Sequence, residues 1–186
     1  MTRRAARSLL IAAAPFVALC TILHAQEPVA PERVRGVDGG AKLLVRELLE
    51  RSSTARDLAG ALGESDVVVY VRHRLFGTKA IRGRIGLVAS DATRRVLAIE
   101  IAQQQTVDDQ LVSLAHELRH AVEIADEPTV RDSNALSVLY MWIGEPTGVA
   151  EAGYESYETQ AAADTGRRVR RELFEPRAEA DAAGRN

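Results

Sequence analysis

The sequence predicts a single domain of the α+β class, in which a small sheet precedes several helices. The chain has 186 residues, of which 46% are hydrophobic and 27% are charged. This length suffices for one core but is short for two ordinary domains. Segments rich in β-branched residues lie between residues 67 and 102, and the segments that follow have helical periodicity. An all-helical domain is the main alternative.

Residues 1–25 have the layout of a secretory signal peptide. Arginines precede an apolar run from Leu9 to Leu23, and Ala25 offers a small residue for cleavage. The run is short for a membrane-spanning helix, so we expect an exported protein, periplasmic or secreted, without a membrane partner after cleavage. An uncleaved anchor is the alternative. Cleavage also removes Cys20, the single cysteine, which excludes disulfide and thiolate chemistry in the mature chain.

Charge and aromatic content argue against a nucleic-acid partner. The chain has 24 Lys and Arg against 26 Asp and Glu, and its aromatic fraction is 4%. Binding to a phosphate backbone needs an excess of cations, and binding to single strands needs aromatic stacking surfaces. We therefore expect no nucleic-acid binding.

The ends of the expected domain are set by composition. Residues 26–40 contain prolines and glycines without an apolar period, which predicts a linker. The domain then covers residues 41–175, and residues 176–186 form a flexible tail. Leucines at helical spacing predict a first helix from Lys42 to Arg51, which Ser52 and Ser53 end.

Three segments predict strands, and later segments predict helices. The strands are Val67 to Val71, Ile81 to Val88 and Arg95 to Ala102. Their short connections contain turn residues, which favours a mainly antiparallel meander. The predicted helices are Leu111 to Ile124 with Thr106 as N-cap, then Val130 to Ile143, then a last helix from about residue 151 or 155 to Phe174.

The first of these later helices contains the motif His116-Glu117-Leu118-Arg119-His120. The two histidines are one helical turn apart, so both imidazoles reach one ion, and Glu117 projects beside them. Neutral imidazoles suit Zn²⁺, the metal lowers the pKa of its bound water to about 7, and an adjacent carboxylate takes the proton. The motif predicts a zinc site with His116 and His120 as ligands and Glu117 as general base. A structural pair of hydrogen-bonded histidines is the alternative.

A catalytic zinc site needs a third protein ligand. His73, the remaining histidine after the signal segment, lies at the first predicted strand, so a carboxylate is expected instead. Glu151, Glu155 and Glu158 are candidates at the start of the last predicted helix.

The motif and the later segment Glu158-Thr159-Gln160-Ala161-Ala162 together resemble the gluzincin branch of zinc metallopeptidases, over roughly Val67 to Leu173. In that family the third ligand is a glutamate that opens such a segment on a later helix. The resemblance implies a zincin-like domain that hydrolyses peptide bonds of a peptide or protein substrate. It implies Glu158 as the third zinc ligand, with Glu155 in reserve. It also implies that the strand Arg95 to Ala102 forms the rim of the cleft, where a peptide adds as an extra strand.

The chain lacks one carboxylate of the family pattern. Many gluzincins carry an Asp four residues after the glutamate ligand, where it orients the first histidine, and here that residue is Ala162. The orienting carboxylate is expected from Asp126, Glu123 or Glu155. Arg119 either pairs with Glu123 one turn later or binds a substrate carboxylate.

Tyrosines supply candidates for stabilising a developing oxyanion. Tyr154 and Tyr157 lie beside the implied ligand Glu158 and rank first, and Tyr140 is a third candidate. The alternative function is an exported zinc-binding or partner-binding protein without peptidase activity.

Overall fold

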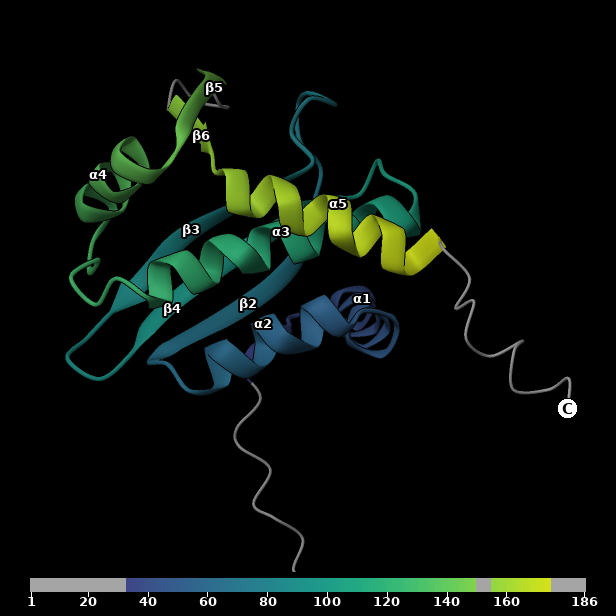
Figure 1. Cartoon of the computed structure of the whole chain (residues 1–186), viewed down its shortest axis with the longest axis horizontal. Coiled ribbons are helices and arrows are strands. Elements are labelled where there is room, and N and C mark those ends of the chain that lie inside the picture. The colour runs from purple at the N-terminus through teal and green to yellow at the C-terminus, as the bar shows by residue number, and fades with distance from the viewer. Residues whose placement is uncertain (1–32, 150–154, 175–186) are drawn as a thin grey trace, which may run out of the picture.

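The computed structural model describes residues 33–149 and 155–174 of the chain (Figure 1). The expected signal peptide and tail therefore lie outside the described residues. The elements follow in the order β1 (Val34–Gly36), α1 (Gly39–Arg51), α2 (Ser53–Gly63), β2 (Val67–Arg74), β3 (Gly83–Ser90), β4 (Arg95–Ala102), α3 (Val107–Ala125), α4 (Ser133–Ile143), β5 (Glu145–Val149), β6 (Glu155–Glu158) and α5 (Gln160–Phe174).

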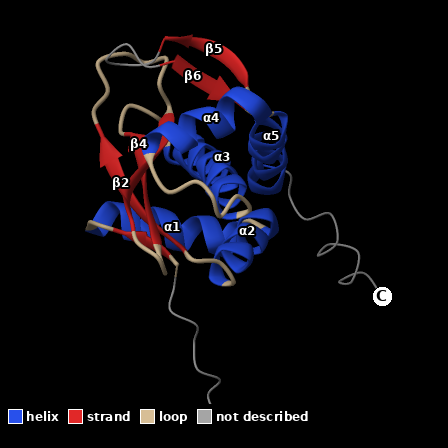
Figure 2. Cartoon of the chain, turned by 90° about the vertical axis from the view of Figure 1, so that its left-hand side faces the viewer, coloured by secondary structure: helices blue, strands red, loops and turns tan. Residues whose placement is uncertain are grey.

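A four-stranded sheet and a layer of helices enclose the core, which confirms the α+β class. Leu97, Ile99 and Ile101 of β4 are fully buried and share one hydrophobic cluster with residues of α1, α2 and α3. Figure 2 shows these helices beside the sheet, with α5 beyond α3. The alternate residues of β2 and β4 point to the opposite face, where several of them are charged. The motif helix α3 is thus covered by the sheet and by α5.

The expected mainly antiparallel meander is wrong. The strand order is β1-β2-β4-β3, in which β1 with β2 and β2 with β4 are parallel and only β3 with β4 is antiparallel. The turn chemistry predicts the β3–β4 hairpin but does not determine which strand lies beside β2. Strand β4 takes one of the two interior positions, beside β2, and is mostly buried. The expected rim strand is therefore central, and β3 is an edge.

The N-terminal part is more ordered than its composition predicts. Residues 34–36, within the expected linker, form β1 and pair with β2, and Asp38 caps α1 by accepting a hydrogen bond from the Ala41 N–H at 2.9 Å. The domain thus begins before residue 41. Ser52 does end α1, but it also caps the unpredicted α2 and donates a hydrogen bond to Glu172 of α5 at 2.5 Å.

The later helices differ from the expectation mainly at their starts. Thr106 caps α3 as predicted, whereas α4 begins at Ser133 after the N-cap Asp132. The last helix begins at Gln160, because the residues before it form the β5–β6 hairpin. Thr159 accepts a hydrogen bond from the Ala162 N–H at 3.1 Å and so caps that helix. No helix in the described parts of the chain combines the length and apolar character needed to cross a membrane.

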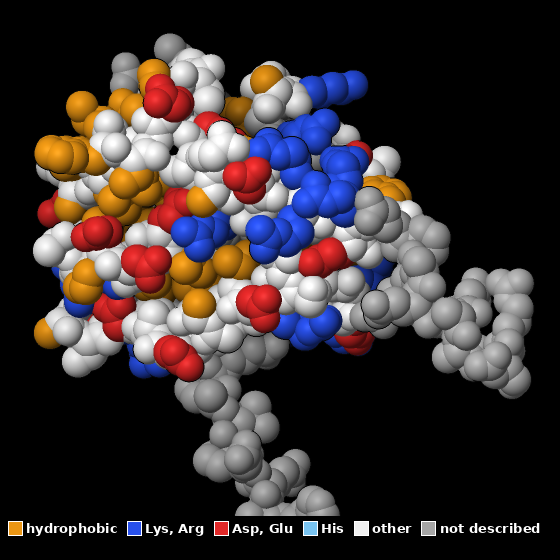
Figure 3. All heavy atoms as spheres, viewed as in Figure 1, with side chains coloured by type: hydrophobic (Ala, Val, Ile, Leu, Met, Phe, Trp, Pro, Cys, Tyr) orange, Lys and Arg blue, Asp and Glu red, His pale blue; other side chains and the backbone are white. Residues whose placement is uncertain are grey.

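Four exposed arginines lie on α5, and Figure 3 shows Lys and Arg side chains gathered on the face where that helix lies. The four arginines of α5 are Arg167, Arg168, Arg170 and Arg171. Arg170 pairs with Asp109 at the start of α3 over 2.7 Å. This pair joins the N-terminal end of the motif helix to α5.

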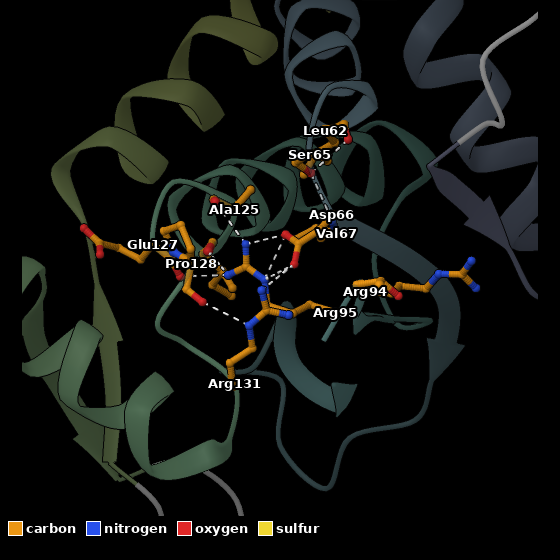
Figure 4. A network of polar contacts seen from close by, with 12 residues as sticks. Leu62, Ser65, Asp66, Val67, Arg94, Arg95, Ala125, Glu127, Pro128 and Arg131 are labelled. Carbon is orange, nitrogen blue, oxygen red and sulfur yellow. Dashed lines mark hydrogen bonds and ion pairs between the residues drawn. The ribbon is translucent and has the colours of Figure 1, made fainter. Parts of the chain in front are cut away.

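The opposite end of α3 is held by a buried arginine of β4 (Figure 4). Arg95 is 1% exposed, and its guanidinium donates hydrogen bonds to Asp66 at 2.6 Å and to three backbone carbonyls at the C-terminal end of α3 and just beyond it. These are the carbonyls of Ile124, Ala125 and Glu127, at 2.5, 3.0 and 2.8 Å. Such carbonyls lack partners within the helix and carry its negative end. Arg95 therefore fixes the motif helix against the sheet.

Candidate metal centre

Helix α3 brings both histidines of the motif to one face, as predicted. The ring centroids of His116 and His120 are 4.9 Å apart. His120 and Glu117 are buried, and His116 is partly buried. Both rings lie between α3 and the elements that follow it, because α5 packs along α3 with Gly166 close to the His116 ring. The motif therefore faces a protected site.

Glu158 completes the cluster from the end of β6. Its Oε2 lies 3.4 Å from His116 Nε2, and its Oε1 lies 3.9 Å from His120 Nε2. The three donor atoms lie within 4.8 Å of one another. Bonds of about 2.1 Å in a tetrahedron place ligands roughly 3.4 Å apart, so the spacing suits one metal ion. The expected position of Glu158 within the last helix is wrong, since it precedes that helix on a strand.

One oxygen of this carboxylate supports a cation site. Glu158 Oε1 is buried and has no hydrogen-bond partner among the described residues. Burial also raises the pKa of Glu158. Buried polar atoms are nearly always paired, and a cation between the carboxylate and the imidazoles would supply the partner. Two imidazole nitrogens and one carboxylate oxygen are donors that zinc accepts.

Glu117 lies beside the cluster but is not part of the donor set. Its Oε1 lies 2.8 Å from the point that a Cβ at Gly83 would occupy, so glycine at this position of β3 makes room for the carboxylate. Burial, together with the charge of Glu158, raises the pKa of Glu117 to about 7. A carboxyl group with this pKa can both accept and release a proton near neutral pH. The sequence signal for this contact was a glycine within a predicted strand.

Glu123 provides the carboxylate that orients a histidine. Its Oε2 lies 2.8 Å from His120 Nδ1, and its Oε1 accepts a hydrogen bond from the Thr159 hydroxyl at 2.8 Å. Of the three expected candidates, Glu123 fills the role, but toward the second histidine rather than the first. Burial has the largest effect on the pKa of His116, which it lowers, and the backbone of Ala162, at the position where many gluzincins carry Asp, acts more weakly in the opposite direction. The contact of Glu123 with Thr159, which follows Glu158, was not predicted.

The two imidazoles have different environments. Burial and the neighbouring His120 lower the pKa of His116 to about 4, so this ring is neutral at neutral pH. Burial also acts to lower the pKa of His120, but the hydrogen bond with Glu123 and the charge of Glu117 outweigh it and raise the pKa. The neutral imidazole is the form that binds metals, and a hydrogen bond at Nδ1 leaves Nε2 for the ion.

The remaining residues predicted for the site are Arg119 and three tyrosines, and they differ in what they contact. Arg119 Nε lies 3.5 Å from Glu123 Oε1, which favours the ion pair over a contact with substrate. The buried Tyr140 donates its hydroxyl to the His120 carbonyl at 3.3 Å, so it supports the motif helix. Tyr157 on β6 is partly buried and lines the cleft. Tyr154 lies outside the described residues.

The cluster opens onto a cleft of about 1000 Å³. Strand β3 forms one wall, residues of α4 and the β5–β6 hairpin form the other, and the motif residues of α3 lie between them. A cleft of this size accepts a ligand as large as a short peptide. Comparisons of the chain with family models, with curated proteins and with solved structures find no match.

Proposed function

We propose that the protein is a zinc-dependent metallopeptidase of the gluzincin type. His116, His120 and Glu158 hold the ion in this proposal. The observation that carries it is the buried Oε1 of Glu158, which has no hydrogen-bond partner among the described residues. This oxygen faces His120 Nε2 within a set of donor atoms spaced for one ion. Bound zinc supplies Lewis acidity, which makes water a better nucleophile and polarises a peptide carbonyl.

Glu117 acts as the general base and then as the proton donor. Its carboxylate accepts a proton from the attacking water and delivers it to the nitrogen of the leaving amine. Burial raises the pKa of Glu117 to about 7 in the metal-free site, and the charge of a bound cation would lower this pKa and so favour the carboxylate that accepts the proton. Tyr157, and Tyr154 by its place in the sequence, are proposed to donate a hydrogen bond to the oxyanion.

Strand β3 is proposed to receive the substrate. It is an edge strand, it lines the cleft, and its Gly83 lies against Glu117. An extended peptide that pairs with such an edge is held by its backbone, and its scissile bond comes close to the catalytic glutamate. Export of the protein remains a prediction from residues 1–25.

The cleft favours this proposal over an exported zinc-binding protein without peptidase activity. Structural zinc sites are closed by four protein ligands, whereas catalytic sites have three and keep one position open. Among the described residues, three donors lie beside a large cleft. Glu117 is buried next to them without being part of the donor set, which a purely structural site would not need.

The substitution Glu117→Gln tests the proposal. It should leave zinc content near one ion per chain and lower casein hydrolysis by about 10² or more, because the proton acceptor is lost. Chelation should abolish the activity of the parent protein, and added zinc should restore it. The exposed Glu64 gives a control, and Glu64→Gln should keep full activity. A fully zinc-loaded protein that cleaves no varied substrate would favour the binding protein instead.

A further inference from the structure

The edge of β3 has a defined arrangement of backbone and side chains. The Ala102 N–H donates a hydrogen bond to the Arg82 carbonyl at 2.9 Å. The backbone carbonyl of Arg82 therefore points toward β4. Residues of an antiparallel strand alternate in this respect, so Gly83 and Ile85 present their N–H and C=O groups to the free edge. Gly83 faces Glu117. The side chains on either side of it, Arg82 and Arg84, point to the opposite face of the sheet.

Arg84 belongs to a cluster with a surplus of positive charge. Glu100 of β4 is buried, and Arg72, Arg74 and Arg84 all bind its carboxylate. The Arg84 Nε lies 2.5 Å and the Arg74 Nη1 3.2 Å from its oxygens. The ring of Phe76 lies 5.6 Å from the guanidinium carbons of both arginines. One carboxylate thus orders three cations, so that arginines outnumber carboxylates in this cluster of described residues.

Arg82 adds to this surplus on the same wall of the cleft. It is exposed and lines the cleft together with Arg72 and Arg84. Its charge helps to lower the pKa of Asp109, but Asp109 already has an ion pair with Arg170 at 2.7 Å.

The opposite wall differs in charge. Its lining residues from α4 and β5 have no charged side chain, and they are Leu136, Ser137, Tyr140, Thr147 and Gly148. Strand β6 adds Glu158, the carboxylate of the candidate metal centre. The cleft is therefore basic along β3, and its described lining has no cation on the wall across from β3, so its charge would attract acidic groups to the β3 side.

We propose that the cleft selects acidic peptides, with Arg82 and Arg84 as specificity residues. A peptide paired with β3 places one side chain opposite Gly83, toward Glu117, and its two neighbours opposite Arg82 and Arg84. Acidic side chains at these neighbouring positions meet the arginines. Arginines lie on both sides of Gly83, so the preference holds for either direction of the peptide. This inference rests on the proposed function, because it takes a peptide as the ligand of the cleft.

Peptide binding to the full-length, zinc-loaded Glu117→Gln variant tests the inference without turnover. Two fluorescein-labelled peptides of equal length, one alternating Ala and Glu and one alternating Ala and Gln, are compared by fluorescence anisotropy. We expect the Glu peptide to bind about tenfold more tightly, and the difference to shrink at high salt, because exposed charges are screened. Adding Arg82→Gln should reduce the preference several-fold, and adding Arg84→Gln as well should remove it. The exposed Arg94 is the matched control, and adding Arg94→Gln should change nothing.

The outcomes separate this inference from the proposed function. Equal affinity for the two peptides, no binding of either one, or a Glu preference that survives loss of both arginines would overturn the selectivity. Hydrolysis by the parent protein is a separate measurement. A clear Glu preference without any hydrolysis of the Glu peptide would leave the selectivity in place and contradict the peptidase.

Discussion

Two buried polar networks contact helix α3, and they differ in how completely their atoms are paired. The network of Arg95 at the C-terminal end is saturated by Asp66 and by backbone carbonyls. The cluster of His116, His120 and Glu158 in the middle leaves Glu158 Oε1 without a hydrogen bond among the described residues. A fully paired buried network stabilises the fold, whereas a buried atom without a partner calls for an explanation such as a bound ion. The first network holds the helix, and we propose that an ion completes the second.

Removal of Arg95 has the largest expected effect. Arg95→Met removes the hydrogen bonds from the buried guanidinium to Asp66 and to the carbonyls of Ile124, Ala125 and Glu127. Arg131 remains as an ion-pair partner of Asp66, and we expect a loss of about 3–5 kcal/mol of unfolding free energy. Urea denaturation in the presence of a chelator measures this loss independently of the metal. The exposed neighbour Arg94 is the control, and Arg94→Met should stay within about 0.5 kcal/mol. A similar small loss for Arg95→Met would show that the saturated network is not structural.

Zinc should stabilise the protein through the unsaturated cluster. At a free zinc concentration of 100 times the dissociation constant, binding adds about 2.7 kcal/mol to the unfolding free energy. Glu158→Leu should remove this gain, because it removes a ligand. Glu155→Ala should retain it. If Glu155→Ala loses the gain and Glu158→Leu keeps it, the third ligand has been misassigned.

The unfolding free energy of the Glu158→Leu variant, measured in the presence of a chelator, tests whether the metal-free cluster is unsaturated. Replacing a buried, unpaired oxygen by an apolar group should raise the unfolding free energy by about 1 kcal/mol. Arg95→Met acts in the opposite direction under these conditions. A metal-free Glu158→Leu protein that is clearly less stable than the parent would mean that Glu158 already has its partners.

Glu123 connects the cluster to the rest of the fold, so its effect should be smaller than that of a ligand. Glu123→Gln retains the size but weakens the hydrogen bond that orients His120, and zinc affinity should fall about 10–100-fold. Competition with a chromogenic chelator measures the affinity, and the absorption spectrum of the Co²⁺-substituted protein reports a changed ligand geometry. Asp126→Asn at the end of α3 is the control. Equal losses for both variants would deny Glu123 a role in orienting His120.

The pH dependence of stability gives the smallest expected effect and concerns the saturated network. Hydrogen bonds from Arg95 hold the pKa of Asp66 below its usual value of 3.8. A carboxylate with a lower pKa in the folded state adds stability above its unfolded pKa, and this stability is lost as pH falls through the folded pKa. Below about pH 4, thermal denaturation of the metal-free parent should therefore show a steeper loss of stability than Asp66→Asn. The exposed Asp57→Asn should follow the parent.

The motif residues illustrate what local sequence predicts well. The spacing of His116 and His120 fixes their common face, because both positions lie on one regular helix. Thr106 caps that helix as predicted, since capping is a contact within three residues. The resemblance named Glu158, and the structure places it beside both histidines. Glu123 was one of three candidates, and only packing against Thr159 and His120 singles it out.

The sequence by itself determined the α+β class, the motif helix and the chemical type of its donor groups, because these depend on composition and on spacings within one helix. Only the tertiary structure decided that β4 is central and β3 is the edge of the cleft, because strand order depends on which distant apolar surfaces pack together. It also decided the partners of Arg95 and the surplus charge around Glu100, because these residues meet groups that lie tens of positions away. Such contacts leave no periodic signal in the chain.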